Sequence, residues 1–345
     1  MLFVDGCSIL QILKKFKPEH PDLLSIKFDE KEDVFTDLHL FENQIPYKVL
    51  ELLSISDYNT LIESMWTFGY NGYLKTKKLT DANLSEFNEL ILHKEDVFKG
   101  EKRGDGSSPP KPYHLLDYMR LLYLKSDYMD FMEPGKEEND DDKCNVLWVK
   151  HKNIREIKES GIKVKRNKTL CLSDVSFKKK YFSGKLKLPS LHVDKTFIYI
   201  FVNMIAYEKC PCFENDYDIC SYLAFLDHLI DDEKDLKELR SSGVFQNLLG
   251  SDKEVVKLLN AIGTELADNE FHLSTGNKVS KKYARVKKAI DKHCRNNWTT
   301  WMSQFYNTHF SSPWSILSFC GAVIAILLTA IQTYLSLRRY FGPKS

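Results

Sequence analysis

The chain has 345 residues, 43% of them hydrophobic and 28% charged, which is enough for one large or two small globular units. Its 49 basic and 48 acidic residues leave a net charge of +1, which argues against a nucleic-acid-binding protein with a broad cationic surface. The first residues lack the basic segment and the uninterrupted apolar run of a signal peptide, so we expect no secretory signal there.

Helical periodicity dominates the chain from its beginning. Asp5 is placed to cap a helix, and Ser251 with Glu254 forms the pattern of a capping box at the start of another. Apolar residues at i, i+3, i+4 and i+7 are typical of helix faces that pack into a core. The predicted core positions are Ile9, Ile12, Leu13, Phe16, Leu84, Phe87, Ile91, Leu115, Met119, Leu122, Ile219, Leu223, Leu226, Ile230, Val255, Leu259, Ile262 and Leu266.

The string LFENQIPYKVLELL, residues 40–53, is the most unusual local pattern. Pro46 suits the first position of a helix that continues over residues 47–53, because the backbone N–H that proline lacks would be unpaired there in any case. The polar groups before it can satisfy exposed backbone donors at the helix start. We expect an orienting role rather than ligand binding. The residues of this motif are Glu42, Asn43, Gln44, Ile45 and Pro46.

Between residues 161 and 194 the apolar period changes to two, and Gly184 and Pro189 interrupt the pattern. This predicts a small antiparallel β-meander inside an α+β fold that is predominantly helical. Charged side chains at its polar positions would protect an exposed strand edge from pairing with another chain. These side chains are Lys178, Lys179, Lys180, Lys185 and Lys187.

No strong catalytic or cofactor-binding signature is present. The chain has neither a phosphate-binding glycine loop nor a G-x-S-x-G nucleophile elbow. Its eight irregularly spaced cysteines are typical of a reduced protein. Cys210 and Cys212 are too close in sequence for a common zinc site completed by Cys220 and His228. We therefore expect a protein that is not an enzyme and that uses no cofactor and no metal.

An enzyme with an unrecognised active site is the alternative. His114 with Asp117, or Asp227 with His228, could pair an imidazole with a carboxylate for acid–base chemistry. The stretch from Asp227 to Glu233 is more typical of a solvated helix end, because lysines follow it directly.

Residues 313–337 contain no charge, and the stretch ends at Arg338 and Arg339. As a helix it would be roughly 37 Å long, enough to cross a hydrocarbon core of roughly 30 Å with some tilt. Its apolar side chains occupy every face, unlike those of most core helices. The sequence predicts one transmembrane helix from Pro313 to Leu337, with Trp314 at its start. A hairpin in the core is the alternative.

Two segments before this helix suit a membrane surface. Residues 296–312 are rich in aromatic rings, which favour the boundary between water and lipid. Residues 278–295 carry eight basic residues and one acidic residue, a charge that could face anionic headgroups. A solvated basic helix covering the domain explains the charge equally well. The basic residues assigned to this juxtamembrane surface are Lys281, Lys282, Arg285, Lys287 and Lys288.

Within the predicted span, Gly321, Ala325 and Thr329 form a ridge of small residues at every fourth position. Such a ridge would allow two helices to pack closely, which suggests self-association. Small residues that merely tolerate lipid contact are the alternative.

A single span near the C-terminus favours post-translational anchoring, with the large domain in the cytosol. The positive-inside rule disagrees, because Arg338, Arg339 and Lys344 would place the tail there instead. We expect a single-pass protein of the plasma membrane or endoplasmic reticulum and favour the cytosolic domain. A receptor with an extracytoplasmic domain is the alternative.

Several short blocks resemble those of one plant family. ENQIP at residues 42–46 resembles the E-N-Q-[IL]-P hallmark of the domain of unknown function 247 family, also called uncharacterised protein family 0481. Ser8 replaces the aromatic residue that follows D-G-C in that family. The resemblance covers essentially the whole chain. The other blocks, in order, are DGC at 5–7, HLLD at 114–117, ESGIKVK at 159–165, NMIAYEKC at 203–210, SYLAFLDHLID at 221–231, LGSD at 249–252 and Pro313 with Trp314.

The resemblance implies a single-pass membrane protein with no established enzymatic activity and no defined catalytic residues. Some grass members are linked to pollen self-incompatibility, which implies protein partners. Family members usually carry a further region before the D-G-C block, so we expect this chain to be truncated at its N-terminus relative to the family.

Together these patterns predict a helix-rich globular domain over residues 1–295 that contains the β-meander and two flexible insertions, at 100–112 and 133–143. The aromatic segment, the span and a short basic tail at 338–345 follow. We expect a recognition or scaffold module tethered at a membrane, with the lipid bilayer and an unknown protein as partners and no nucleic acid.

Overall fold

The computed structural model describes residues 2–15, 28–54, 58–75, 111–124, 152–167, 171–179, 183–211, 217–267, 281–295 and 313–341. The predicted insertions lie outside these ranges, except for residues 111 and 112, as do the aromatic segment 296–312 and the apolar stripe from Leu84 to Ile91. Helices make up most of the described chain, and two small sheets accompany them, so the predominantly helical α+β class is confirmed.

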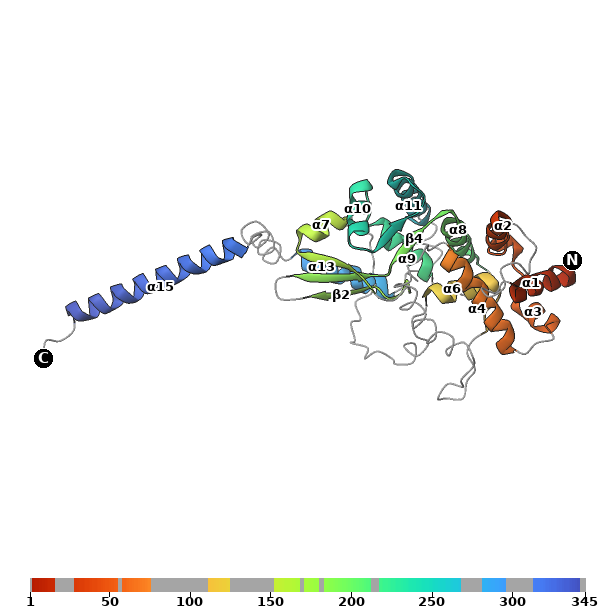
Figure 1. Cartoon of the computed structure of the whole chain (residues 1–345), viewed down its shortest axis with the longest axis horizontal. Helices are drawn as coiled ribbons and strands as arrows, with labels where there is room; N and C mark the ends of the chain where they lie inside the picture. Colours follow the sequence, from red (N-terminus) through yellow and green to blue (C-terminus); the bar gives the residue numbers. More distant parts are fainter. Residues whose placement is uncertain are drawn as a thin grey trace.

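Helices from the first 124 residues gather toward the N-terminal end of the molecule (Figure 1). They are α1 (Leu2–Lys15), α2 (Phe28–Asp37), the short 3-10 helix η1 (Phe41–Asn43), α3 (Tyr47–Leu53), α4 (Tyr58–Lys75) and α6 (Leu115–Leu124). The predicted core positions Leu13 in α1 and Met119 in α6 are buried. Asp5 does not cap α1, because the helix already begins at Leu2 and Asp5 lies inside it.

The β-structure is not the predicted antiparallel meander. Its strands are β1 (Ile162–Arg166), β2 (Ser176–Lys179), β3 (Gly184–Leu188), β4 (Leu191–Val193) and β5 (Phe245–Asn247). β3 lies between β1 and β2, parallel to the first and antiparallel to the second. β4 pairs in parallel with β5, a strand that the sequence pattern did not reveal. A period of two identifies the face of each side chain but not the order of the strands.

The helices between residues 154 and 294 contribute to the same core as the N-terminal helices. They are α7 (Ile154–Glu159), α8 (Lys195–Lys209), α9 (Asp218–Asp227), α10 (Glu233–Ser241), α11 (Asp252–Ala267) and α13 (Lys281–Cys294). Every residue of α9 from Ile219 to Leu226 is buried, and the helix contacts α8, α11 and α13. The predicted stripe on α9 is confirmed, although its last residue, Ile230, follows the helix end.

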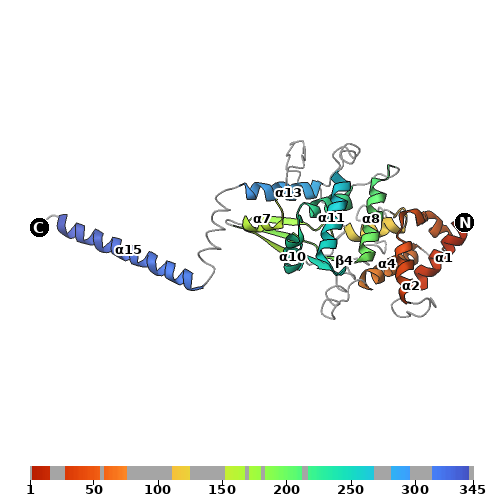
Figure 2. The same ribbon diagram turned by 90° about the horizontal axis from the view of Figure 1, so that it is seen from above.

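The last described helix, α15 (Pro313–Phe341), extends away from the rest of the molecule at the end where the three-stranded sheet and α13 lie (Figures 1 and 2). It begins at the predicted residue and continues beyond Leu337. Residues Leu317–Leu337 have a mean hydropathy of 1.9, and none of this window is buried in the protein. Among the described helices, α15 is the one long and apolar enough to cross a membrane.

His39 lies buried between aromatic rings at the end of α2. Its ring centroid is 4.4 Å from that of Phe35 and 5.7 Å from that of Phe68. Burial lowers the pKa of His39 to about 4, although a hydrogen bond with the Phe35 carbonyl acts in the opposite direction. The folded protein therefore binds fewer protons at His39 than the unfolded chain does between pH 4 and about 6.5. The contribution of His39 to the free energy of unfolding therefore rises with pH across that window and is lost on acidification.

We expect acidification from pH 7 to pH 5 to lower the free energy of unfolding by about 1–3 kcal/mol through His39 alone. Urea unfolding at a series of pH values measures the slope. Because other buried histidines contribute to it, the informative quantity is the difference between the wild type and His39→Phe. Equal slopes for the two proteins would contradict the prediction.

Candidate functional site

Gln44 joins the turn of the ENQIP block to helix α6. Its Nε2 donates to the backbone carbonyls of Leu38, at 2.9 Å, and Leu40, at 2.7 Å. Its Oε1 accepts from the backbone N–H of Leu116 at 2.8 Å. The amide thus satisfies a backbone donor at the start of α6, whereas the sequence pattern had suggested the start of α3. Gln44 holds the turn in shape and fixes it against a helix 72 residues away in sequence.

The other residues of the block have different environments. Glu42 and Asn43 are exposed, and Asn43 donates its Nδ2 to the carbonyl of Asp37 at 3.0 Å. Ile45 is buried in the core. Pro46 occupies the N-cap position of α3, with φ −54° and ψ 132°, one residue before the predicted place. The block therefore has a structural role, and two of its polar side chains are exposed to solvent.

Replacing Gln44 with alanine should lower the free energy of unfolding by about 1–3 kcal/mol, because three backbone partners lose their hydrogen bonds. Thermal unfolding followed by circular dichroism measures the change. Glu42→Ala is the matched control in the same block, and its effect should stay within about 0.5 kcal/mol because the side chain is exposed. Equal losses for the two variants would contradict the role assigned to Gln44.

His114 and Asp117 order the start of α6. The Asp117 carboxylate accepts from the backbone N–H of Tyr113 at 2.9 Å, and His114 Nδ1 accepts from the backbone N–H of Asp117 at 3.1 Å. Burial lowers the pKa of His114 to about 4, so its ring is neutral at pH 7. The Tyr113 carbonyl also accepts from the backbone N–H of Tyr47, which ties the same turn to α3. These two candidate catalytic side chains thus serve as helix caps.

A buried ion pair lies one turn further along α6. Arg120 Nε donates to Glu208 Oε1 at 2.6 Å, with side-chain exposures of 8% and 0%. Although burial opposes the charge, Glu208 raises the pKa of Arg120. The carboxylate also accepts from the backbone N–H groups of Ile219, at 3.1 Å, and Cys220, at 2.9 Å, at the N-terminus of α9. A helix N-terminus favours negative charge, so the carboxylate stabilises the start of α9. Glu208 thus connects α6, α8 and α9 through one side chain.

This ion pair could be predicted from the sequence only in part. A signal for it exists, since Glu208 lies four residues after the buried Met204 and eight after the buried Ile200, on the core face of α8. An acidic residue at such a position requires a buried partner. Nothing in the sequence indicates that Arg120 is that partner, because the two residues are 88 positions apart.

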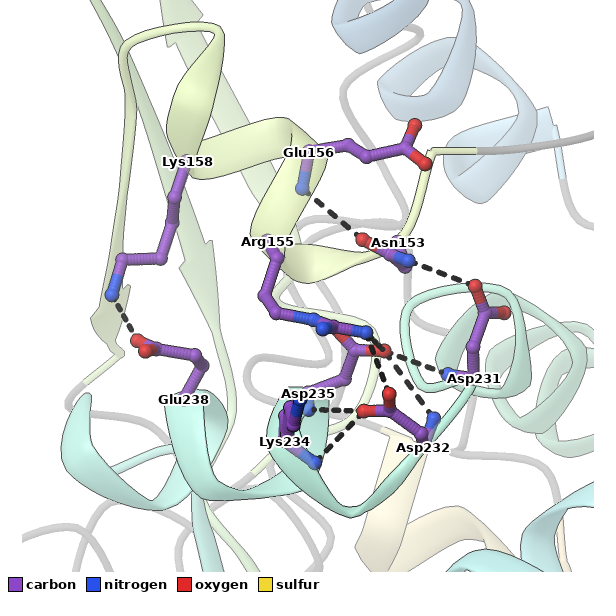
Figure 3. A network of polar contacts seen from close by, with 9 residues as sticks. All are labelled: Asn153, Arg155, Glu156, Lys158, Asp231, Asp232, Lys234, Asp235 and Glu238. Atoms are coloured by element: carbon purple, nitrogen blue, oxygen red, sulfur yellow. Dashed lines mark hydrogen bonds and ion pairs between the residues drawn. The ribbon is translucent and has the colours of Figure 1, made fainter.

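A second polar network connects α7 to the start of α10 (Figure 3). Arg155 donates from Nη2 to Asp232 at 2.7 Å and from Nε to Asp235 at 2.8 Å. Asp232 and Asp235 form a capping box at the start of α10. Asn153 caps α7 and donates its Nδ2 to Asp231 at 2.9 Å. The acidic stretch is a helix end with Asp231 and Glu233 exposed, as predicted, and it is also a helix cap bound by an arginine.

Asp227 and His228, the second candidate catalytic pair, lie at the end of α9. His228 Nδ1 is 3.9 Å from Asp227 Oδ2, too far for a hydrogen bond. Burial and the charge of Asp231 raise the pKa of Asp227 to about 6, and burial and the charge of Lys287 lower the pKa of His228 to about 4. The Asp227 carboxyl packs against α11 at Gly263, where a Cβ atom would come within 2.2 Å of it. Burial is the largest cause of both shifts, and neither requires a catalytic site.

Cysteine and metal chemistry have little support in the described residues. No group of three or more His, Cys, Asp or Glu side chains is placed there to hold a metal ion. Cys220 is buried, and burial raises the pKa of its thiol. Cys210 is half-buried, and Cys212 lies outside the described residues.

Helix α13 separates its basic side chains from its core side chains. Lys282, Arg285 and Lys288 are exposed, and residues such as Tyr283 are buried. Lys287 differs from the other predicted surface lysines, because it is half-buried and burial lowers its pKa to about 8. Lys281 is the first residue of the helix. The structure therefore supports a basic face made by only part of the predicted set.

On α15, the small residues Gly321, Ala325 and Thr329 are exposed. A Cβ atom added at Gly321 would meet nothing within 4 Å. Thr329 Oγ1 donates to the Ala325 carbonyl at 2.8 Å, so its hydroxyl is satisfied within the helix. Pro313 and Trp314 form the first turn. The ridge is therefore exposed, and self-association through it stays a prediction.

Comparisons with known proteins agree with the resemblance of the sequence blocks. The model of the family DUF247, described as "Plant protein of unknown function", matches residues 1–328. UPF0481 protein At3g47200 of Arabidopsis thaliana is 25% identical over 363 aligned positions, which cover 100% of this chain and 69% of the relative. The putative UPF0481 protein At3g02645 of the same plant is 23% identical over 183 positions, which cover 52% of this chain and 32% of the relative. No solved structure matches. The chain therefore belongs to the DUF247 family of plant proteins of unknown function.

Proposed function

We propose that this protein is a single-pass membrane protein whose helix-rich domain recognises or scaffolds another protein. The observation that carries the membrane part is the window Leu317–Leu337 of α15, which is apolar and exposed along its whole length. Water would solvate these side chains poorly, whereas a bilayer matches both the length and the polarity of the helix.

Binding, rather than catalysis, is supported by the polar side chains of the core. The buried ion pair and the ordered caps hold helices from distant parts of the chain together. Both pairs considered for acid–base chemistry have packing or capping roles. A domain of this kind presents a fixed surface, which is what a protein partner needs.

Fractionation of cells that express the full-length chain tests the tether. The protein should remain in the membrane pellet after alkaline extraction. In sealed vesicles with their cytosolic side outward, protease should digest the domain and leave a short protected fragment. Recovery in the soluble fraction would refute the tether. A protected domain whose mass falls after glycosidase treatment would instead support the extracytoplasmic receptor.

Affinity capture from solubilised membranes tests the recognition role. The same partner should be recovered repeatedly in mild detergent and should be absent with an unrelated tail-anchored protein as bait. Failure to recover any specific partner from all tissues that express the protein would count against recognition.

A further inference from the structure

One face of the three-stranded sheet carries five lysines. Lys163 on β1, Lys185 on β3 and Lys178 on β2 lie directly opposite one another in a single row. Lys165 and Lys187 are opposite each other two positions along, on the same face. The lysines on β1 and β2 are exposed, and the two on β3 are half-buried. Neighbouring strands are about 4.8 Å apart, so the five lysine side chains project from closely spaced positions of the sheet.

The opposite face of this sheet packs into the core. Ile162 and Leu186 are buried there. A Cβ atom at Gly184 would come within 2.6 Å of the Phe177 ring, so the glycine leaves room for that ring. The Phe177 ring centroid is 5.7 Å from that of His293 on α13. Helix α13 therefore covers the apolar face, and the lysine face points the other way.

Folding alone does not account for the lysine face. Like charges placed directly opposite each other on neighbouring strands destabilise a sheet. Edge protection, which the sequence suggested, does not explain Lys185 and Lys187, because β3 is the central strand. Within the described chain, Lys163, Lys165 and Lys178 form no ion pair with an acidic side chain. An external anionic partner would complement the charges of these three lysines.

We infer that the lysine face is a docking surface for the anionic headgroups of the membrane that holds α15, an inference that rests on the proposed tether. Charge complementarity supports a surface of repeated phosphates rather than a single ligand, since three exposed lysines and two half-buried ones share this face. The net charge of the whole chain is only +1, so the concentration of positive charge on this face is local.

The position of the sheet supports the same partner. The sheet lies at the end of the molecule from which α15 extends (Figures 1 and 2). The connecting residues 296–312 can span at most about 60 Å, which keeps the face within reach of the bilayer. Anionic lipids are concentrated in the cytoplasmic leaflet, so docking requires the domain to lie in the cytosol.

Lysine acylation of the reconstituted full-length protein tests the docking. The protein is placed in vesicles of phosphatidylcholine, with or without phosphatidylserine, and the acylation of each lysine is read by mass spectrometry. Acylation of Lys163, Lys165 and Lys178 should fall several-fold in the vesicles with phosphatidylserine and recover at high salt. Lys253 and Lys257, exposed on α11, should react equally in both.

Charge-neutralised variants locate the docking surface. Each lysine near an anionic surface contributes about fivefold to binding, so the triple variant Lys163→Gln, Lys165→Gln, Lys178→Gln should lower the ratio of docked to free domain about a hundredfold. Lys185 and Lys187 then report the loss, by reacting equally in both kinds of vesicle. The matched control, Lys282→Gln, Arg285→Gln, Lys288→Gln, removes the same charge from α13 and should keep Lys185 and Lys187 protected.

Three outcomes would overturn the docking. The first is equal acylation of the sheet lysines in both kinds of vesicle. The second is loss of protection in the α13 variant but not in the sheet variant. The third is protection by soluble polyglutamate on neutral vesicles without protection by phosphatidylserine. The last would favour an acidic protein. Flotation of the same vesicles separates the two proposals, because a protein that fails to float refutes the tether, whereas one that floats with reactive lysines refutes only the docking.

Discussion

Two arginines placed in the middle of α15, by Ile324→Arg and Leu328→Arg, should release the protein from membranes into the soluble fraction. Each arginine at the centre of a spanning helix costs about 2.5–3.5 kcal/mol, so the pair should cost about 5–7 kcal/mol. This corresponds to a loss of more than a thousandfold in the preference for the bilayer. Alkaline extraction followed by flotation measures the partition.

The control places the same two arginines at the end of the helix, by Ser336→Arg and Leu337→Arg. These positions lie beside Arg338 and Arg339, where long side chains can extend their charges to the headgroups. The control protein should float with the vesicles. If the central variant also stayed in the membrane, α15 would have to be held by something other than the apolar character of its middle turns.

Replacing Glu208 with alanine should lower the free energy of unfolding by about 3–5 kcal/mol, because Arg120 would be left buried with an uncompensated charge. Two backbone donors at the start of α9 would lose their acceptor at the same time. For a domain of this size the melting temperature should fall by roughly 6–20 °C. Thermal unfolding in detergent, read by circular dichroism, measures the change.

The double variant Arg120→Met, Glu208→Met separates the ion pair from the helix cap. Exchanging both charges for apolar side chains of similar size often costs little, so the stability should recover in part. Recovery should remain incomplete, because methionine accepts hydrogen bonds poorly from the donors of α9. Lys257→Ala, at an exposed position in the interior of α11, should have almost no effect. A double variant less stable than Glu208→Ala would contradict this account.

Periodicity predicted much of the fold. The stripes on α6, α9 and α11 are in the core, because burial of one face is what creates the spacing. Strand order was not predictable, since Lys163 and Lys185 alternate with apolar neighbours in the same way whether their strands are parallel or antiparallel. β5 is only three residues long, too short for a period of two to stand out.

Site residues were predictable only where their partners are local in sequence. Gln44 was identified as an orienting side chain from its place before Pro46, but its contact with Leu116 depends on tertiary packing. Arg120 and Arg155 were missed for the same reason, because each meets carboxylates about 80 or more residues away. The capping box of α10 was missed although the spacing of Asp232 and Asp235 is visible in the sequence.

The parallel pairing of β4 with β5 has a consequence for synthesis of the protein. Leu191 and Val193 on β4 are buried, yet the strand that pairs with them begins about 50 residues later, at Phe245. At a translation rate of about 5–20 residues per second, β4 leaves the ribosome roughly 3–10 s before its partner. During that interval its backbone donors and acceptors can join other nascent chains. The protein should therefore depend on chaperones that shield the growing chain until β5 has been made.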